Sequence, residues 1–352
     1  MQKLPYKPSG TPDSWEKPVD FFARREHYLD HIAGTWLALP KEYRGSFYVP
    51  EYMAKYSKKY NFEIVPLKHK SNTPIMVHIP VGGGPMVVPA YGDMQKAYIT
   101  DQNRPYFLTE HGVGLTFKHP GYAGGEGSRR FISFFLCPNK HTYDKNRKTY
   151  PAAAIAITGT PKLDKWFNAP VKKRDDPPTV AISFHWDGHM ICPEAGNAFF
   201  YYKDVIPELK KHFNLIGHSH PLIADKLYPF YESHGIKIER SFDKVMEMAD
   251  LYVNDCSSTM YEFCVTGKPV VILNSPHFRK HIDQGIRFWE YTDIGPMVED
   301  PKDLIPAINE ALSCTLYKSN IEKMIADLYP HFGNAANTTA EAIVNFVEGK
   351  RR

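Results

Sequence analysis

Short apolar runs separated by helical patterns fill most of the chain, and this order is typical of parallel α/β folds. The clearest example is the stretch Ser241–Asn274. Within it, Leu251–Asn254 predicts a buried strand, and an apolar stripe that begins at Thr259 predicts a helix ending at Gly267. Pro269–Leu273 predicts a second strand, which a right-handed crossover would lay parallel to the first. The stretch therefore forms one strand–helix–strand unit.

The same alternation continues on both sides of this unit. It predicts two Rossmann-like domains, each built on a parallel sheet, that face each other across a cleft. Further strands are expected at Ser46–Val49, Phe62–Pro66, Ile75–Ile79, Met86–Ala90, Ala97–Ile99, Tyr106–Glu110, Phe131–Leu136, Ala153–Ile157, Thr179–Phe184 and Phe213–Gly217, and helices at Phe21–Leu39, Glu51–Tyr60, Phe199–His212, Pro301–Leu312 and Glu341–Val347.

The best candidate for a domain boundary is Asn168–Pro178, which combines charged residues with prolines and has no apolar periodicity. We therefore expect a first domain over residues 1–168, a linker over 169–178 and a second domain over 179–352. The pattern assigns no partner to the last predicted helix, Glu341–Val347.

Composition narrows the class of protein without identifying it. Hydrophobic residues make up 43% of the 352 residues and charged residues 23%, as in soluble globular proteins. The net charge of +4 is too small to indicate a nucleic-acid or membrane partner. Five cysteines without a CxxC pair, and the lack of a long apolar run, favour a cytoplasmic protein with reduced thiols.

Polar clusters follow four of the predicted strands, at the point where each strand ends. Because ligands of parallel α/β folds bind at the carboxyl ends of strands, these clusters are candidate site residues. A histidine there can take a proton from a hydroxyl, while backbone N–H groups, lysine and serine can bind phosphate. The clusters contain His111 and Gly112, Gly159 and Lys162, His218 and His220, and Asp255, Ser257 and Ser258.

Each cluster also has a purely structural interpretation. Ser257 and Ser258 precede a helix, where serine hydroxyls commonly cap the first N–H groups, and the sequence leaves capping and phosphate binding open. Taken alone, His111 is more readily interpreted as a hydrogen-bonded loop histidine than as a base.

A metal site is a further alternative. His185, Asp187 and His189 alternate with other residues, so an extended segment would place them on one face. With His218 and His220 nearby in sequence, a zinc or manganese hydrolase is conceivable. However, the chain has neither an HExxH motif nor paired cysteines. We therefore expect no metal and no cofactor.

In this order, the motifs resemble those of the CDP-glycerol glycerophosphotransferases, the primases and polymerases of teichoic acid. The resemblance covers residues from about 106 to 300 and is strongest over 242–273. It implies a GT-B architecture of two Rossmann-like domains, and transfer from a nucleotide-activated donor without an essential metal. The motifs that carry it are His111-Gly112, Gly159–Lys162, His220-Pro221, Asp255–Ser258 and Gly267–Pro269.

The resemblance also implies roles for individual residues. His111 and His220 would be the catalytic and phosphate-contacting histidines. In the resulting mechanism, His111 acts as general base on an acceptor hydroxyl, while His220 and Lys162 stabilise charge on the donor phosphates. The donor and phosphate-binding residues would be Gly112, Gly159, Lys162, His218, Asp255, Ser257, Ser258 and Glu262.

The sequence departs from the family pattern beside several motifs. The usual Thr-Pro-Leu-Lys after His-Gly is Val113–Thr116, the usual Arg-Asn-Asp is Lys162–Asp164, and the usual tyrosine before Ser-Ser is Cys256. These departures affect the expected substrate more than the expected fold. The transferred group is left open between a glycerol- or alditol-phosphate, moved by attack at phosphorus, and a glycosyl group, moved by attack at a sugar carbon.

The expected partners are a nucleotide-activated donor, either CDP-glycerol or a nucleotide-sugar, and an acceptor polymer or glycan. Peripheral contact with a membrane face is compatible with them. A glycosyltransferase acting on a modified base in DNA is an alternative, and the lysines between residues 55 and 70 are a faint indication of the basic groove it would need. A non-catalytic nucleotide-sugar binder would bind donor without turnover.

Overall fold

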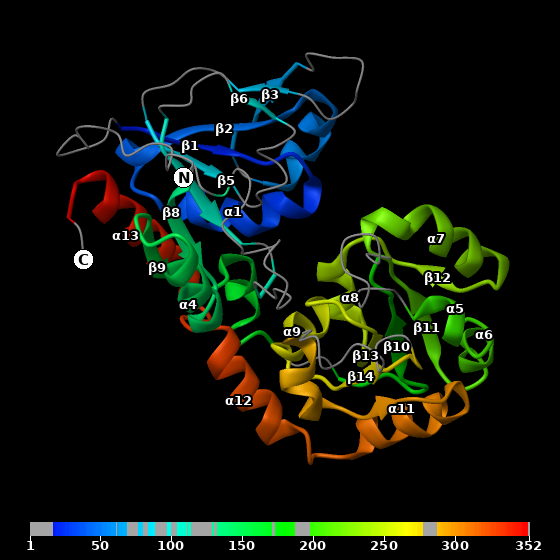
Figure 1. The fold of residues 1–352 in the computed structure, drawn as a ribbon. Helices are drawn as coiled ribbons and strands as arrows, with labels where there is room; N and C mark the ends of the chain where they lie inside the picture. The colour runs from blue at the N-terminus through cyan, green and yellow to red at the C-terminus, as the bar shows by residue number, and fades with distance from the viewer. Residues whose placement is uncertain are drawn as a thin grey trace, which may run out of the picture. The chain divides into compact units, whose positions relative to one another are not determined.

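The computed structural model describes residues 17–60, 62–68, 77–79, 84–88, 97–99, 104–110, 112–113, 129, 132–170, 173–186, 198–276 and 287–350. These residues form two compact units (Figure 1). The first unit comprises the described residues up to Phe167 together with those from Asp327 onward. The second unit runs from Asn168 to Ala326.

The main sheet of the first unit is parallel throughout its described pairings, in the order β3-β2-β1-β5-β7-β8-β9. Two further strands, β4 and β6, pair with each other. Helices α1 (Glu26–Ala38), α4 (Lys140–Thr149) and α13 (Ala335–Val347) belong to this unit, with the 3-10 segments η1 (Lys41–Tyr43), η2 (Glu51–Lys59) and η4 (Pro161–Trp166). The strands are β1 (Val19–Phe22), β2 (Arg44–Pro50), β3 (Val65–Leu67), β4 (Val77–Ile79), β5 (Met86–Val88), β6 (Ala97–Ile99), β7 (Tyr106–Thr109), β8 (Ile132–Cys137) and β9 (Ala154–Ile157).

The sheet of the second unit is also parallel, in the order β12-β11-β10-β13-β14-β15. Numbered from the first strand of the unit, this is the 3-2-1-4-5-6 order of the Rossmann fold, in which the strand order reverses between β10 and β13. The strands are β10 (Thr179–Ile182), β11 (Asn214–Gly217), β12 (Lys237–Ile238), β13 (Leu251–Asn254), β14 (Val270–Leu273) and β15 (Met297–Val298).

The helices of the second unit connect these strands. Those before β13 are α5 (Phe199–Tyr202), α6 (Ile206–Leu209), η5 (Pro221–Ile223), α7 (Ala224–Ser233) and α8 (Phe242–Met248). Those after it are α9 (Thr259–Cys264), η7 (Arg287–Ile294), η8 (Pro301–Asp303), α11 (Leu304–Ser313) and α12 (Lys318–Leu328). In the described part of the chain, no helix combines the length and the apolar character that crossing a bilayer requires.

Most of the expected strands of the second unit lie where the apolar runs predict them, and Leu251–Asn254 coincides with β13. Several expected helices differ, among them Glu51–Tyr60, where the chain forms the 3-10 segment η2. Phe21 and Phe22 belong to β1, a strand whose neighbours on both sides bury it, before α1 begins at Glu26. The expected helix at Phe199–His212 is divided into α5 and α6, because Pro207 cannot continue a helical hydrogen-bond ladder but fits its first turn.

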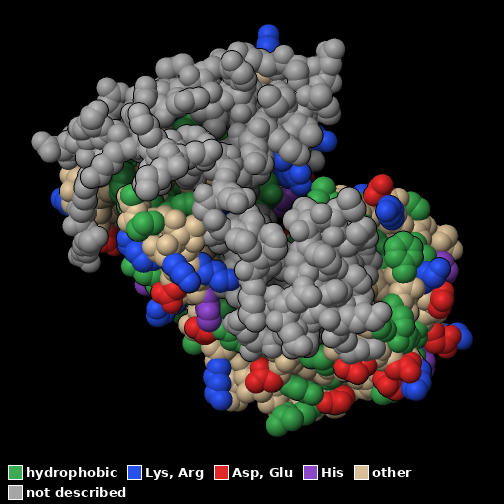
Figure 2. All heavy atoms as spheres, viewed as in Figure 1, with side chains coloured by type: hydrophobic (Ala, Val, Ile, Leu, Met, Phe, Trp, Pro, Cys, Tyr) green, Lys and Arg blue, Asp and Glu red, His purple; other side chains and the backbone are tan. Residues whose placement is uncertain are grey.

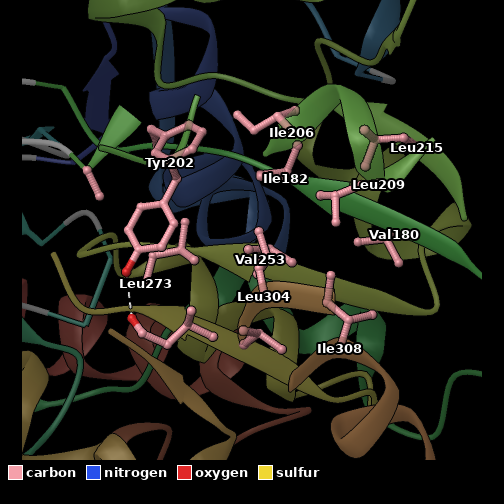
Figure 3. Packing of buried hydrophobic residues seen from close by; sticks show 14 of the residues in the cluster. Val180, Ile182, Tyr202, Ile206, Leu209, Leu215, Val253, Leu273, Leu304 and Ile308 are labelled. Atoms are coloured by element: carbon pink, nitrogen blue, oxygen red, sulfur yellow. Dashed lines mark hydrogen bonds between the residues drawn. The ribbon is translucent and has the colours of Figure 1, made fainter. Parts of the chain in front are cut away.

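The core of the second unit is built from strand residues that are buried on both faces of the sheet, as in parallel sheets covered by helices. Figure 3 shows Ile182 of β10, Val253 of β13 and Leu273 of β14 meeting side chains from the surrounding helices. Tyr202 of α5 lies fully inside this core, and its hydroxyl donates a 2.6 Å hydrogen bond to the carbonyl of Val298. The polar end of this large side chain is therefore satisfied without contact with water.

The last helix finds its partner in the first unit. The ring of Phe346 stacks on Phe134 of β8, with centroids 4.9 Å apart, and meets Phe107 of β7 edge-on at 5.0 Å. On α1, Gly34 lies beside Ala336, whose Cβ would be 3.6 Å from a Cβ at this position. The second unit therefore ends near Ala326, whereas the sequence placed its domain boundary at residue 352. The expected linker at 169–178 begins within two residues of the point where the chain passes from the first unit to the second.

A single carboxylate holds the start of this last helix. Asp164 of η4 accepts hydrogen bonds from the backbone N–H groups of Gly333 (3.0 Å), Ala335 (3.0 Å) and Ala336 (2.7 Å). These are N–H groups of the kind that a helix leaves without partners at its first turn. Burial raises the pKa of Asp164, while the three backbone hydrogen bonds lower it. Asp164 thus caps α13 from a distant part of the sequence.

We predict that Asp164→Ala lowers the stability of α13 by about 1–3 kcal/mol, because it leaves three N–H groups at a helix start without their acceptor. Amide hydrogen exchange of α13 measures this directly, since a chain with two units need not unfold in one step. Asp144→Ala is the control, because Asp144 is an exposed aspartate of the same unit whose ion pair with Lys140 is also exposed. Equal exchange of α13 in both variants would contradict the prediction.

Candidate functional site

The carboxyl end of β13 is tied to the carboxyl end of β10 by one side chain. Asn254, fully buried, donates from Nδ2 to the carbonyl of Ser183 at 3.0 Å and accepts the backbone N–H of Ser257 at its Oδ1, also at 3.0 Å. The turn that begins the Asp-x-Ser-Ser motif is therefore fixed against the neighbouring strand. This is the position where the strand order reverses, and where doubly wound folds bind their ligands.

Asp255 lies inside this turn and is only 2% exposed. Its Oδ1 accepts the backbone N–H of His185 at 2.8 Å, and its Oδ2 accepts that of Ala198 at 3.0 Å. Burial raises the pKa of Asp255 to about 6, and the backbone hydrogen bonds oppose this rise. Both oxygens of the carboxylate are thus used by the protein itself, whereas the sequence predicts a contact between Asp255 and donor phosphate.

The two serines of the motif have different environments. The buried Ser257 hydroxyl accepts the backbone N–H of Thr259 at 3.3 Å and the Thr259 hydroxyl at 3.0 Å. Ser258 is the residue before α9, is partly exposed, and makes no capping bond with its side chain. Capping therefore explains Ser257 and leaves Ser258 without a structural role of that kind.

His220 begins the His-Pro motif at the carboxyl end of β11. Its Nδ1 accepts the backbone N–H of Leu222 at 3.2 Å, and Pro221 occupies the first position of η5. An accepting Nδ1 places the proton of the neutral ring on Nε2, which makes Nε2 a hydrogen-bond donor. The His220 ring lies 5.3 Å from that of His185 and 6.3 Å from that of Trp186, measured between centroids.

His218 precedes His220 by two residues but is buried. Its Nδ1 lies 2.8 Å from the carbonyl oxygen of Glu239, so Nδ1 carries the proton and donates it. Burial lowers the pKa of His218, which keeps the ring neutral at pH 7. The hydroxyl of Tyr231 donates to the His218 carbonyl at 3.2 Å, and its ring occupies the space that a side chain at Gly217 would need. The expected phosphate contact of His218 would thus involve a neutral imidazole.

The Gly-Lys-Pro motif has a structural function. Gly267 adopts a positive φ of 72° after α9, a conformation that glycine tolerates best. The Lys268 ammonium donates to three carbonyls at the end of α8, those of Met246 (2.6 Å), Glu247 (3.2 Å) and Ala249 (2.9 Å). Glu262, expected on the donor side, is a buried residue of α9 with 1% exposure.

In the first unit, the Gly-x-Pro-Lys motif follows β9. Gly159 has a φ of 84°, and a Cβ there would lie 2.4 Å from the carbonyl oxygen of Pro330, so only glycine fits. The Nζ atom of Lys162 lies 3.3 Å from Nε2 of His31, a buried residue of α1. Lys162 is therefore brought together with a histidine that the sequence did not single out.

The His-Gly motif is described only in part, because His111 lies outside the described residues. Gly112 has a φ of 71°. The preceding residue, Glu110, forms a buried bidentate ion pair with Arg129, with N–O distances of 2.7 and 2.9 Å. The expected role of His111 stays a prediction.

Two residues of the second unit join the candidate site without having been assigned to it from the sequence. His185 and Trp186 follow β10. From the sequence, His185 was a candidate only for the alternative metal site. Their position directly after an apolar run was the available signal, since β10 borders the reversal of strand order. Among the residues that the structure describes, no three His, Cys, Asp or Glu side chains gather as metal ligands would, and Asp187 and His189 lie outside them.

Figure 2 shows lysine, arginine and acidic side chains interspersed on the described surface of the second unit, with neither sign dominating in this view. The lysines between residues 55 and 70 are described only in part. The alternative of a DNA acceptor stays a prediction.

Comparisons with known proteins agree with the motifs. Residues 194–349 match the family model of CDP-Glycerol:Poly(glycerophosphate) glycerophosphotransferase, which covers less than half of the chain. No curated protein sequence matches.

Solved structures match over almost the whole chain. The wall teichoic acid polymerase TagF is 15% identical, with a TM-score of 0.63 over 96% of this chain and 90% of that chain. A putative UDP-N-acetylglucosamine 2-epimerase from Listeria monocytogenes is 12% identical, with a TM-score of 0.59 over 94% and 96% of the two chains. A UDP-GlcNAc 2-epimerase from Neisseria meningitidis, bound to UDP-GlcNAc, is 13% identical, with a TM-score of 0.58 over 94% and 100%.

At these identities the structural matches establish the fold, which is that of GT-B enzymes. The family model adds a sequence match, which runs through most of the second unit and through the last helix. Together they confirm the resemblance read from the motifs: the fold is of the GT-B type, and residues 194–349 are similar in sequence to CDP-glycerol glycerophosphotransferases.

Proposed function

We propose that the protein transfers a glycerol-phosphate or related alditol-phosphate group from a CDP-activated donor to an acceptor hydroxyl. The observation that carries the proposal is the meeting of two motifs at the reversal of strand order. His220 of the His-Pro motif lies against His185, and the His185 N–H is held by Asp255 of the Asp-x-Ser-Ser motif. The family model covers both motifs. One of the TagF structures comes from a crystal soaked with CDPG, which supports testing CDP-glycerol first.

In the proposed reaction, the acceptor oxygen attacks the phosphorus that carries the glycerol group, and the bond from that phosphorus to the CMP oxygen breaks. A proton leaves the acceptor hydroxyl, and negative charge collects on the departing CMP phosphate. The chain must therefore supply a base for the proton and hydrogen-bond donors for the phosphate. A nucleotide-sugar donor would instead react at the sugar carbon and release a nucleoside diphosphate.

His220 can supply one of the hydrogen-bond donors that the phosphate requires. Because Nδ1 accepts from Leu222, the neutral ring presents its proton at Nε2. Ser258 offers a hydroxyl that the capping of α9 does not use. We assign His220 and Ser258 to the donor phosphates, and Ser257 mainly to holding the turn through Thr259.

The base and the acceptor side are assigned to the first unit. We propose His111 as the base, and Lys162, with Gly159 and Gly112 shaping the adjoining turns, as a source of positive charge for phosphate. This assignment rests on the motif order and on the family resemblance. Contact with a membrane face stays a prediction.

We predict that Ser258→Ala weakens binding of CDP-glycerol about tenfold or more, the cost of losing a hydrogen bond to a charged group. The fold should be unaffected, because the Ser258 side chain makes no capping bond. Isothermal titration with CDP-glycerol, with UDP-GlcNAc in parallel, measures both affinity and choice of donor. Ser233→Ala is the matched control, since the exposed Ser233 hydroxyl bonds the Phe230 carbonyl and the His234 ring at the end of α7, away from the motifs. Tighter binding of UDP-GlcNAc than of CDP-glycerol would point to a glycosyl donor.

We predict separate effects for the two histidines. His111→Ala should lower kcat by about 10²–10⁴-fold with donor affinity nearly unchanged, as expected for loss of a general base. His220→Ala should weaken donor binding and turnover together. Donor titrations followed by single-turnover CMP release on an oligo(glycerophosphate) primer separate the two effects. Loss of donor binding in His111→Ala, or nearly full turnover, would show that the base is misassigned.

We predict that CMP release survives treatment with EDTA, because lysine and histidine side chains can offset phosphate charge in place of a cation. Rates measured after chelation, and after re-addition of single divalent ions, test this. Activity abolished by EDTA and restored by one ion would instead support the His185, Asp187 and His189 alternative, and substitution of Asp187 would then remove the response.

A further inference from the structure

One carboxylate holds two backbone amides that are well separated in sequence. The N–H of His185 follows β10, and the N–H of Ala198 immediately precedes α5. Asp255 accepts the first at Oδ1 and the second at Oδ2. The chain is thus fixed both where it leaves β10 and where it starts α5, and the anchor for both points directly follows β13.

This anchor sets the position of a ring in the candidate site. His185 lies with its ring centroid 5.3 Å from that of His220, and its Nδ1 is 2.8 Å from the carbonyl oxygen of Trp186. A carbonyl only accepts, so Nδ1 of His185 carries the proton. With its backbone N–H held by Asp255 and its ring oriented by Trp186, His185 has little freedom to move away from His220.

We propose that Asp255 is a positioning residue of the donor site, which keeps His185 against His220 by holding the amides of His185 and Ala198. The proposal rests on the donor site of the proposed function. It assigns Asp255 an action through other residues instead of a contact with donor phosphate, which a buried anion would repel. A carboxylate suits this task because each of its two oxygens accepts an N–H.

The ionised form of Asp255 is required, since a protonated carboxyl turns one oxygen into a hydroxyl. Burial raises the pKa of Asp255 to about 6. Among the described residues, the titratable groups around it include His185, whose backbone N–H it accepts, and the phenols of Tyr231 on α7 and Tyr252 on β13, which interact with it electrostatically. Burial raises the pKa of both phenols above the ordinary value, so they stay neutral and do not compete for protons near pH 6.

The pH dependence of the fold distinguishes a positioning role of Asp255 from an effect of Asp255 on global stability. A carboxyl whose pKa is higher in the folded than in the unfolded chain binds its proton more tightly when folded, so this group does not destabilise the fold as the pH falls through 6. The hold on the two amides should nevertheless weaken over the same interval. Below pH 6 we therefore expect the segments at His185 and Ala198 to loosen locally while the protein stays folded.

A matched control exists at the other end of the same strand. Asp250 is also buried, and its Oδ2 accepts the backbone N–H groups of Asp175 (3.2 Å) and Thr179 (2.8 Å). It lies at the amino end of β13, away from the strand ends that carry the motifs. Asp250→Asn therefore reports the cost of removing the charge of a buried carboxylate that accepts two amides, without affecting the donor site, because the amide oxygen of asparagine can still accept both N–H groups.

The test combines amide exchange with donor binding in wild type, Asp255→Asn and Asp250→Asn. NMR-detected exchange of the His185 and Ala198 amides, corrected for intrinsic rates, is followed from pH 8 to pH 5. In wild type, protection of at least one of the two amides should fall about tenfold or more on passing below pH 6. Asp255→Asn should lack this pH response and leave at least one amide poorly protected, because its NH2 group cannot accept. Asp250→Asn should behave as wild type.

Binding of CDP-glycerol at pH 8 completes the test. Asp255→Asn should bind about tenfold or more weakly, and Asp250→Asn as tightly as wild type. Equal donor affinity of Asp255→Asn and wild type would overturn the positioning role, as would pH-independent protection in wild type. If wild type bound no CDP-glycerol, the proposed function would fail, while the exchange data would still show whether Asp255 holds the two amides. Should Asp255→Asn not fold, the wild-type pH series decides.

Discussion

The parallel pairing of β10 with β13 is the contact on which the rest of the second unit depends. It places Val180, Ala181 and Ile182 beside Leu251, Tyr252 and Val253, so that both strands end at the same edge of the sheet. Strand order reverses there, and the connections leaving the two strands turn to opposite sides. The Asp-x-Ser-Ser turn and the residues directly after β10 therefore lie together at this edge. Without this pairing, Asp255 would have no access to the His185 amide.

The polar groups at this edge are arranged mainly to hold the backbone. Asn254, Asp255 and Ser257 use their side chains on N–H and carbonyl groups of neighbouring segments. Lys268 does the same at the end of α8. This is the support that a site needs if its few ligand-facing groups are to stay in place. Burying an ionised Asp255 costs free energy, as its raised pKa indicates, so the fold accepts a local penalty where it holds the amides of His185 and Ala198.

The first unit shows the same use of long-range contacts in a different place. Asp164 belongs to the Gly-x-Pro motif region yet caps α13, which closes the chain on the sheet of its first half. The two units are consequently not separated by a single cut in the sequence. A residue in a family motif can thus serve the fold, as Asp164 and Lys268 do, and motif membership alone does not make it a ligand contact.

The sequence by itself determined the strand and helix alternation and the motif order, and the family resemblance of those motifs implied the GT-B type of fold. The alternation and the motifs are local features, because apolar periodicity and turn residues depend on neighbours along the chain. Only the tertiary structure decided that the last helix packs on Phe134, that Lys162 lies beside His31, and that Asp255 holds the amides of His185 and Ala198. Each of these contacts joins segments distant in sequence, and their pairing follows from how the sheets and helices pack, which no local pattern specifies.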